Sequence, residues 1–366
     1  MKLVSKTAKA RLPRRRFLHL AGGVLGALAA GCVPQTPAPE SAALPDYVDG
    51  GLGIPVFRGP YLQRDAHIAA FLLPARIEAL RSLCDTYLNT PSDGAVDYRP
   101  LGPYALLLYA DMQIQSLDDR DQVIGWMQET EASFWVPAVA RSKPGGGFRT
   151  PNHAAWFLPY LFVDNPYAIA SGREVYGFPK TEGHFEKATR IQNPEFAVEV
   201  WGFTEFGPQV EGKPRPLLET RKIGGDSEDT VPDTWTDWDA ARSALIRQVF
   251  KDWTPSADGE DYEAQWFESL EAMPLVFLKQ FRDAAESRKA CYQAVIEAPV
   301  QLSTFYGGGF IDAAYALTLY PLASHPLAQT LGLSVDSSDA APALAAFWLH
   351  LDFTLGPGVE VWHAGT

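Results

Sequence analysis

The sequence predicts a β-rich α+β protein built around an antiparallel β-sheet that is closed or strongly curved. At least eight apolar or aromatic runs have the length and the composition of β-strands. The alternation is clearest in residues 347–355, where Phe, Leu, Leu, Phe and Leu alternate with Trp, His, Asp and Thr. Few segments show helical spacing. Many strands with few helices to cover them favour a sheet that closes or curves on itself.

The strand-like runs follow one another along most of the chain, with Gly, Pro, Asn and Asp between them. They occupy residues 67–74, 103–115, 132–140, 153–164, 196–203, 291–309, 313–322 and 347–355. We interpret the three glycines at 307–309 as a hairpin turn, because no glycine motif here follows a strand and opens a helix as a phosphate-binding loop does.

Two short helices are expected among these strands. The first begins after Asn165, which can cap a helix, with Pro166 at its first position and Gly177 at its end. The second lies within residues 325–333. Both have the start and stop residues that helices prefer.

Residues 211–289 differ from the rest of the chain. They contain several acidic, turn-like clusters, and between these lie stretches with helical character at 237–250 and 272–289. The region shows no strand signal and too little apolar content for a core of its own. We therefore predict a helical insertion into one sheet domain that spans residues 51–366.

Residues 1–31 are typical of an export signal, because a basic start precedes an apolar stretch of about a dozen residues. Arg14 and Arg15, followed by Phe17 and Leu18, resemble the twin-arginine pattern. The sequence LAAGC that ends at Cys32 resembles a lipobox, which makes Cys32 the candidate lipidated residue. The alternative is an ordinary cleaved signal with an accidental cysteine. Residues 32–50 are rich in Pro and Ala and are expected to form an extended linker.

The resemblance to a twin-arginine signal implies export in the folded state. Two acyl chains on Cys32 would hold the protein stably on a membrane. We therefore expect a membrane-anchored lipoprotein that faces the periplasm or the cell exterior. No other segment has the length and apolar character to span a bilayer, so the lipid is the expected membrane contact.

The charge balance argues against a nucleic-acid partner. The chain has 31 Lys and Arg against 44 Asp and Glu, and seven of the basic residues precede Cys32. The remaining 24 basic and 44 acidic residues give the mature part a net charge of −20. Such a charge repels phosphate backbones and anionic lipid surfaces alike.

The cysteines and histidines offer no metal or cofactor motif. Cys84 and Cys291 lie in apolar segments, so they can pair in an oxidising compartment or form two separate buried thiols. The seven histidines show no metal-ligand spacing, and no nucleotide-binding loop is present. We expect neither a metal nor a cofactor.

One segment carries a specific resemblance to a known family. Residues 164–180, DNPYAIASGREVYGFPK, resemble the active-site segment of the acetoacetate decarboxylase family in identity and in spacing. The sequence RGPY at 58–61 and Glu131, six residues before Pro137, resemble two earlier family motifs. The resemblance extends over residues 51–366 and is weaker across 211–289. It implies a β-rich fold with a closed, cone-like sheet, a homo-oligomer and a lysine that forms a Schiff base in an apolar pocket.

The resemblance implies that Lys180 is the catalytic nucleophile in the decarboxylation of an acetoacetate-like β-keto acid. The attacking amine has to be neutral, and burial among apolar walls disfavours its charged form. Tyr176 and Phe178 are the expected walls of the substrate pocket. No carboxylate is adjacent to Lys180 in sequence, so we expect the amine to be largely neutral near neutral pH. Thr181 stands where well-known decarboxylases have a second lysine.

The remaining site residues follow from the same resemblance. Glu131 is expected to orient the substrate or to carry a proton, with Glu129 as a close competitor and a merely structural role as the alternative. A second family glutamate has no clear counterpart, and Asp111 is the best match. Arg64 is the candidate that binds the substrate carboxylate. Thr181 and the missing glutamate leave two alternatives open, a related Schiff-base aldolase or dehydratase and a non-catalytic, lipid-anchored binding protein.

Overall fold

The computed structural model describes residues 44–51, 56–141, 153–225, 234–249 and 273–365. The chain divides into two compact units, Met1–Asp49 and Gly50–Thr366. In the first unit, residues 44–49 are exposed and have no regular secondary structure. The predicted signal at 1–31 and Cys32 lie outside the described residues.

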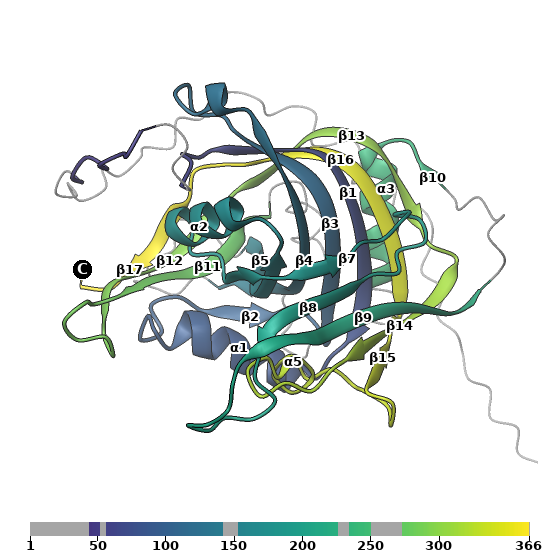
Figure 1. The fold of residues 1–366 in the computed structure, drawn as a ribbon. Coiled ribbons are helices and arrows are strands. Elements are labelled where there is room, and N and C mark those ends of the chain that lie inside the picture. Colours follow the sequence, from purple (N-terminus) through teal and green to yellow (C-terminus); the bar gives the residue numbers. More distant parts are fainter. Residues whose placement is uncertain (1–43, 52–55, 142–152, 226–233, 250–272, 366) are drawn as a thin grey trace, which may run out of the picture. The chain divides into compact units, whose positions relative to one another are not determined.

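The second unit contains a 12-stranded sheet that positions the candidate site (Figure 1). Its main path runs β10-β13-β16-β1-β3-β4-β5-β11-β12-β17, while β2 pairs with β4 and β6 pairs with β5. In the order of this path the strands are β10 (Thr234–Trp235), β13 (Val300–Phe310), β16 (Ala345–Leu355), β1 (Tyr61–Pro74), β3 (Tyr104–Ser116), β4 (Trp126–Ala140), β5 (His153–Val163), β11 (Leu275–Arg282), β12 (Ala290–Ala298) and β17 (Val359–His363), with β2 (Tyr98–Pro100) and β6 (Lys180–Glu182) beside them.

A second sheet has five strands in the order β15-β14-β9-β8-β7. These are β15 (Ala340–Pro342), β14 (Ala313–Leu319), β9 (Lys213–Gly225), β8 (Ala197–Gly202) and β7 (His184–Glu186). The helical segments are short: α1 (Ile77–Cys84) continued by a π-helix (Asp85–Asn89), a 3-10 turn (Gln122–Ile124), α2 (Pro166–Val175), α3 (Trp238–Val249) and α5 (Leu327–Leu331). The β-rich class, the predicted strands and the two expected helices are confirmed.

The expectation of a closed, cone-like sheet is not confirmed. Within the described residues neither sheet closes, since the long sheet ends at β10 on one side and β17 on the other. The pairing is also not purely antiparallel. Strand β5 pairs in parallel with β6 and with β11, and α2 forms the crossover from β5 to β6. A parallel neighbour requires such a crossover connection.

The long sheet is buried on both faces by two separate clusters of apolar side chains. Along β1, Ala69, Phe71 and Leu73 belong to one cluster, which also contains side chains of the five-stranded sheet. The alternate residues Ile68, Ala70 and Leu72 belong to the other cluster, which includes Ala168 of α2. The alternation of a strand thus divides β1 between two cores. The candidate site lies on the face of the second cluster.

Two predictions about residues 211–310 are wrong. Residues 211–289 are not a helical insertion: β9 is the central strand of the five-stranded sheet, and β11 pairs with β5 and β12. Among the described residues of this region, only α3 agrees with the predicted helices. Within the predicted helical stretch at 272–289, Leu275–Arg282 form β11 because its apolar residues pair with β5 and β12, a tertiary effect that overrides local propensity.

The glycines at 307–309 lie inside β13 rather than in a turn. A Cβ on Gly308 would meet Leu349 Cδ2 at 2.8 Å and the Trp348 carbonyl oxygen at 2.9 Å, so a close approach of β16 explains this glycine. The predicted run 291–309 divides at Pro299, which has no N–H to donate to a sheet.

The cysteine expectation is half right. Cys84 is buried, whereas Cys291 is exposed, and the two thiols are free. Cys291 lies at the end of β12 whose first residues are exposed, so the apolar sequence around it does not ensure burial. Among the described residues, no helix has the length and apolar character to cross a membrane.

Candidate active site

Helix α2 and the turn after it carry the residues that resemble the family motif. Asn165 caps the helix, and its side-chain oxygen accepts hydrogen bonds from the backbone N–H groups of Tyr167 and Ala168 at 2.9 Å and 3.2 Å. Gly177 ends the helix with a φ of +85°, a conformation that glycine adopts without strain. A Cβ there would lie 2.5 Å from Lys279 Cα. The capping and stop residues predicted from the sequence are confirmed.

Lys180 is the first residue of β6 and pairs with Leu161 of β5. Its side chain runs beneath α2, where a Cβ on Gly172 would lie 2.9 Å from Lys180 Cδ. Arg173 Nη1 donates a hydrogen bond to the Lys180 carbonyl oxygen at 3.0 Å. Arg173 of α2 therefore holds the Lys180 backbone, and Gly172 leaves room for the Lys180 side chain.

Two glutamates of β4 face the same pocket as Lys180. Glu129 and Glu131 are two residues apart, and the side chains at i and i+2 of a strand lie on one face. Lys180 Nζ donates to Glu129 Oε1 at 2.9 Å and to Oε2 at 3.1 Å. The side chain of Glu129 is fully buried and that of Lys180 is 8% exposed. This ion pair is therefore almost completely removed from water.

Glu131 is buried beside this pair. Burial, followed by repulsion from Glu129, raises the pKa of Glu131 to about 8, although Lys180 opposes the change. Ser133 Oγ donates to Glu131 Oε1 at 3.4 Å and accepts a hydrogen bond from Trp135 Nε1 at 2.7 Å. At neutral pH Glu131 therefore holds a proton that it can donate.

The rest of the pocket is largely apolar. It has a volume of about 70 Å³ and lies on the second core cluster. Lys180 Nζ lies 5.4 Å from the ring centroid of Phe178, which packs against Phe277 at 4.1 Å between centroids. Tyr176 also lines the pocket, and its hydroxyl donates to the Gly356 carbonyl oxygen at 2.9 Å. These walls exclude water from the amine.

The structure brings most of the predicted site residues together. Lys180, Glu131, Tyr176 and Phe178 all line one pocket. Arg64 is not among the residues that line it. The preceding residue, Gln63, faces the pocket, so Arg64 is directed away from it, and its Nη2 donates to Gln113 Oε1 at 3.0 Å.

No carboxylate is adjacent to Lys180 in sequence, but the fold gives its amine a carboxylate partner, Glu129. Glu129 is distant in sequence, but the pairing of β4, β5 and β6 places its carboxylate against the amine. Asp111, the best sequence match to a second glutamate, does not line the pocket and accepts hydrogen bonds from Gln128 and Thr130 instead.

Glu129 is the residue whose importance the sequence left open. The spacing of Glu129 and Glu131 was the available signal, because a strand places both on one face. Ser133 and Trp135 lie on the same face of β4 as Glu131, because they follow it at intervals of two residues. Their hydrogen bonds near Glu131 could therefore be expected once β4 is recognised as a strand. Among the described residues, the pocket side chains form no group with metal-binding geometry; Asp65, His67 and His350, which do form one, lie on another face of the sheet.

Residues 52–207 match the family model described as acetoacetate decarboxylase, and this range contains both glutamates and Lys180. This part of the chain is an acetoacetate decarboxylase domain. Among curated proteins, no sequence match to the chain is found.

Solved structures extend the likeness beyond the acetoacetate decarboxylase domain. An acetoacetate decarboxylase from Legionella pneumophila subsp. pneumophila str. Philadelphia 1 has a TM-score of 0.56 at 15% identity, and the match covers 89% of this chain and 95% of that chain. A second acetoacetate decarboxylase structure has a TM-score of 0.53 at 14% identity, with 85% and 93% covered. At these identities the likeness shows a common fold over most of the chain.

Proposed function

We propose that the protein is a Schiff-base-forming lyase that decarboxylates a small, acetoacetate-like β-keto acid through Lys180. The observation that carries this proposal is the buried Lys180 amine, held 2.9 Å and 3.1 Å from the Glu129 oxygens in a mostly apolar pocket. A lysine that is removed from water in an apolar pocket can become a nucleophile.

In the proposed reaction, Glu129 accepts a proton from the Lys180 ammonium, and the free amine attacks the ketone carbon. The resulting carbinolamine loses water and becomes a protonated imine between Nζ and that carbon. The bond to the carboxylate carbon then breaks, CO₂ leaves, and the electron pair moves to the imine nitrogen to give an enamine. A proton added to the enamine carbon restores the imine, and water releases the ketone and Lys180.

Glu131 is the proposed acid of this reaction. Its pKa of about 8 keeps it protonated at neutral pH, so it can donate a proton to the departing hydroxyl. It then takes up the proton that Glu129 received from Lys180 and donates this proton to the enamine carbon. Among the described residues that line the pocket, Lys180 is the one cation. Once Lys180 is bound as an imine, none of these described residues offers an arginine or a second lysine to the substrate carboxylate, and this favours its departure as neutral CO₂.

A second apolar cavity bears on the size of the substrate. It has a volume of about 200 Å³, lies on the same face of the long sheet, and shares Trp135 and Phe353 with the lysine pocket. Trp156 and Trp238 also line it. Keto acids with an apolar tail therefore belong in any substrate panel beside acetoacetate.

The test follows ¹³C-labelled keto acids by NMR with the purified protein. The panel contains acetoacetate, β-keto acids with alkyl or aryl tails, and pyruvate. Labelled CO₂ from a β-keto acid, lost in Lys180→Arg and kept in Lys279→Arg, supports the proposal, since arginine cannot form the imine. Lys279 is a matched control because its amine is half-buried and donates to the Val175 carbonyl oxygen.

Other results of this experiment identify the alternatives. New carbon–carbon bonds or loss of water without CO₂ would indicate aldol or dehydratase chemistry on the same lysine. Binding of a ligand without turnover of any keto acid would indicate a binding protein and contradict the proposal.

We also propose that the protein is exported and anchored by lipid on Cys32, because the sequence before it combines a twin-arginine-like pair with a lipobox-like end. Metabolic labelling with a palmitate analogue should mark the wild type, and equal labelling of Cys32→Ser would contradict this. A homo-oligomer is the proposed assembly, and light scattering during gel filtration measures its mass.

A further inference from the structure

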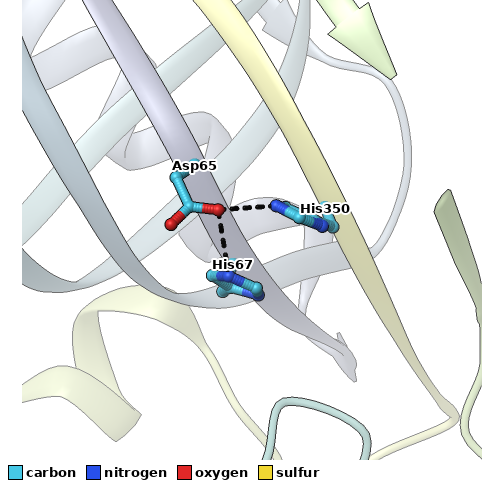
Figure 2. A group of neighbouring side chains, drawn as sticks. All are labelled: Asp65, His67 and His350. Carbon is cyan, nitrogen blue, oxygen red and sulfur yellow. Dashed lines mark hydrogen bonds and ion pairs between the residues drawn. The ribbon is translucent and has the colours of Figure 1, made fainter. Parts of the chain in front are cut away.

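Three side chains converge on the face of the long sheet opposite the lysine pocket. Asp65 and His67 belong to β1 and His350 belongs to the neighbouring strand β16 (Figure 2). His67 and His350 are direct cross-strand partners. Their alternate neighbours Ile68 and Leu349 point to the other face and line the apolar cavity there. We call Asp65, His67 and His350 the His-Asp cluster.

Both imidazoles of the His-Asp cluster point at one carboxylate oxygen (Figure 2). His350 Nε2 lies 2.8 Å and His67 Nε2 lies 3.3 Å from Asp65 Oδ1. The rings are stacked, with centroids 4.2 Å apart and an interplanar angle of 16°. All three potential ligand atoms lie within 4.8 Å of one another. Two donors bound about 2.1 Å from one tetrahedral ion lie about 3.4 Å apart, so small side-chain movements would bring all three to one ion.

The backbone holds Asp65 in an unusual position. The pairing of β1 shifts register between Gln63 and Ala66 against β16, which places Asp65 in a bulge. Its φ is +50°, a left-handed conformation that few residues other than glycine adopt. Without this bulge a strand residue two positions from His67 would lie about 7 Å further along the strand. The bulge turns the carboxylate back toward the two histidines.

A second layer of hydrogen bonds supports the His-Asp cluster. The Asp65 backbone N–H donates to Asp352 Oδ1 at 2.8 Å, and Tyr306 donates from its hydroxyl to Asp352 Oδ2 at 2.8 Å. The Tyr306 ring lies 4.6 Å from the His350 ring. Outer groups that orient the ligands in this way are typical of metal sites.

We propose that Asp65, His67 and His350 bind a divalent transition-metal ion such as Zn²⁺. Two imidazole nitrogens and one carboxylate oxygen are a ligand set that such ions prefer over Mg²⁺ and Ca²⁺, which favour oxygen ligands. The side chains of Asp65, His67 and His350 are 56%, 43% and 28% exposed, so an ion and a water ligand can reach them from solvent. The ion would join β1 to β16 and stabilise the bulge.

The proposed metal site is independent of the lysine chemistry. Its ligands come from the opposite face of β1 and β16, and none of them lines the lysine pocket. The ion would therefore stabilise the sheet rather than contact the substrate. Removing the ion is expected to lower thermal stability without changing the site of imine formation.

The test uses untagged protein freed of metal by a chelator and then dialysed against ZnCl₂. We expect one zinc per chain by elemental analysis and a higher melting temperature with zinc than without. Asp65→Asn, His67→Ala and His350→Ala should each weaken zinc binding by more than about 100-fold, and Asp352→Asn by about 10-fold, as an outer-layer change does. His184→Ala is the matched control, because His184 is an exposed histidine of β7 outside the cluster.

Cobalt gives a second readout that does not depend on stability. CoCl₂ should produce visible absorption bands in the wild type and in His184→Ala, and these bands should be absent in His350→Ala. Circular dichroism without metal shows whether each variant is folded. The proposal is overturned if the folded wild type binds no more zinc than the folded His350→Ala variant, or if His184→Ala loses zinc as fully as the cluster variants do.

Discussion

Replacing Glu131 with glutamine should stabilise the protein more strongly as pH rises. The pKa of Glu131 is about 8 in the folded protein, against 4.5 for a solvated glutamate. Because the pKa of Glu131 is raised in the folded protein, its protonated side chain contributes fully to the free energy of unfolding below about pH 4.5, and this contribution is lost as pH rises through about 8. The two pKa values differ by about 3.5, which corresponds to about 5 kcal/mol of stability at about 1.36 kcal/mol per pKa unit. At pH 7 the loss is already about 3 kcal/mol.

Glutamine has nearly the same shape and never ionises, so Glu131→Gln should escape this loss. Urea unfolding at pH 5, 7 and 9 measures the difference in free energy of unfolding between variant and wild type. That difference should grow by about 1.4 kcal/mol per pH unit up to pH 8 and then level off. The variant should also lose activity, as expected where a catalytic group is held in an unfavourable site. A difference that is the same at all three pH values would show that Glu131 has no raised pKa in the folded protein.

Three further variants test the geometry. Gly172→Ala should fold, yet it should lower the rate of imine formation by about 100-fold, because the added Cβ would lie 2.9 Å from Lys180 Cδ and push the lysine side chain away. An unchanged rate in single-turnover trapping would contradict this. Glu129→Gln should lower the free energy of unfolding by about 3–5 kcal/mol, since this single change leaves the buried Lys180 charge unpaired. The double variant Glu129→Gln with Lys180→Met should lower it by much less. Urea titrations in which the effects of the two changes simply add would argue against the ion pair. Asn165→Ala should lower the free energy of unfolding by about 1 kcal/mol, and Asn165→Asp should lower it less, because aspartate still caps α2. Equal melting temperatures for the wild type and both variants would show that the cap does not stabilise the protein.

The local features of the site could be predicted from the sequence. Asn165, Pro166 and Gly177 act through hydrogen bonds and backbone angles within a few residues, so their effect on α2 is encoded locally. Tyr176, Phe178 and Lys180 follow on the same turn. These three side chains reach one pocket because the motif segment folds as one piece.

The partners of Lys180 could not be predicted, because sheet pairing decides them. Glu129 meets Lys180 through β4, β5 and β6, and the sequence gives no register for those strands. The same limit applies to residues 211–289, where β9 and β11 are strands because of their neighbours. His67 and His350 show no metal-ligand spacing for the same reason, since only the pairing of β1 with β16 makes them adjacent.

The proposed function requires covalent chemistry at Lys180, and peptide mapping after borohydride reduction can detect it. The protein is incubated with the keto acid that it turns over, reduced, digested and analysed by mass spectrometry. We predict one adduct on Lys180, present in the wild type and in Lys279→Arg and absent from folded Lys180→Arg. An adduct on a different lysine, or turnover that persists in Lys180→Arg, would contradict the account.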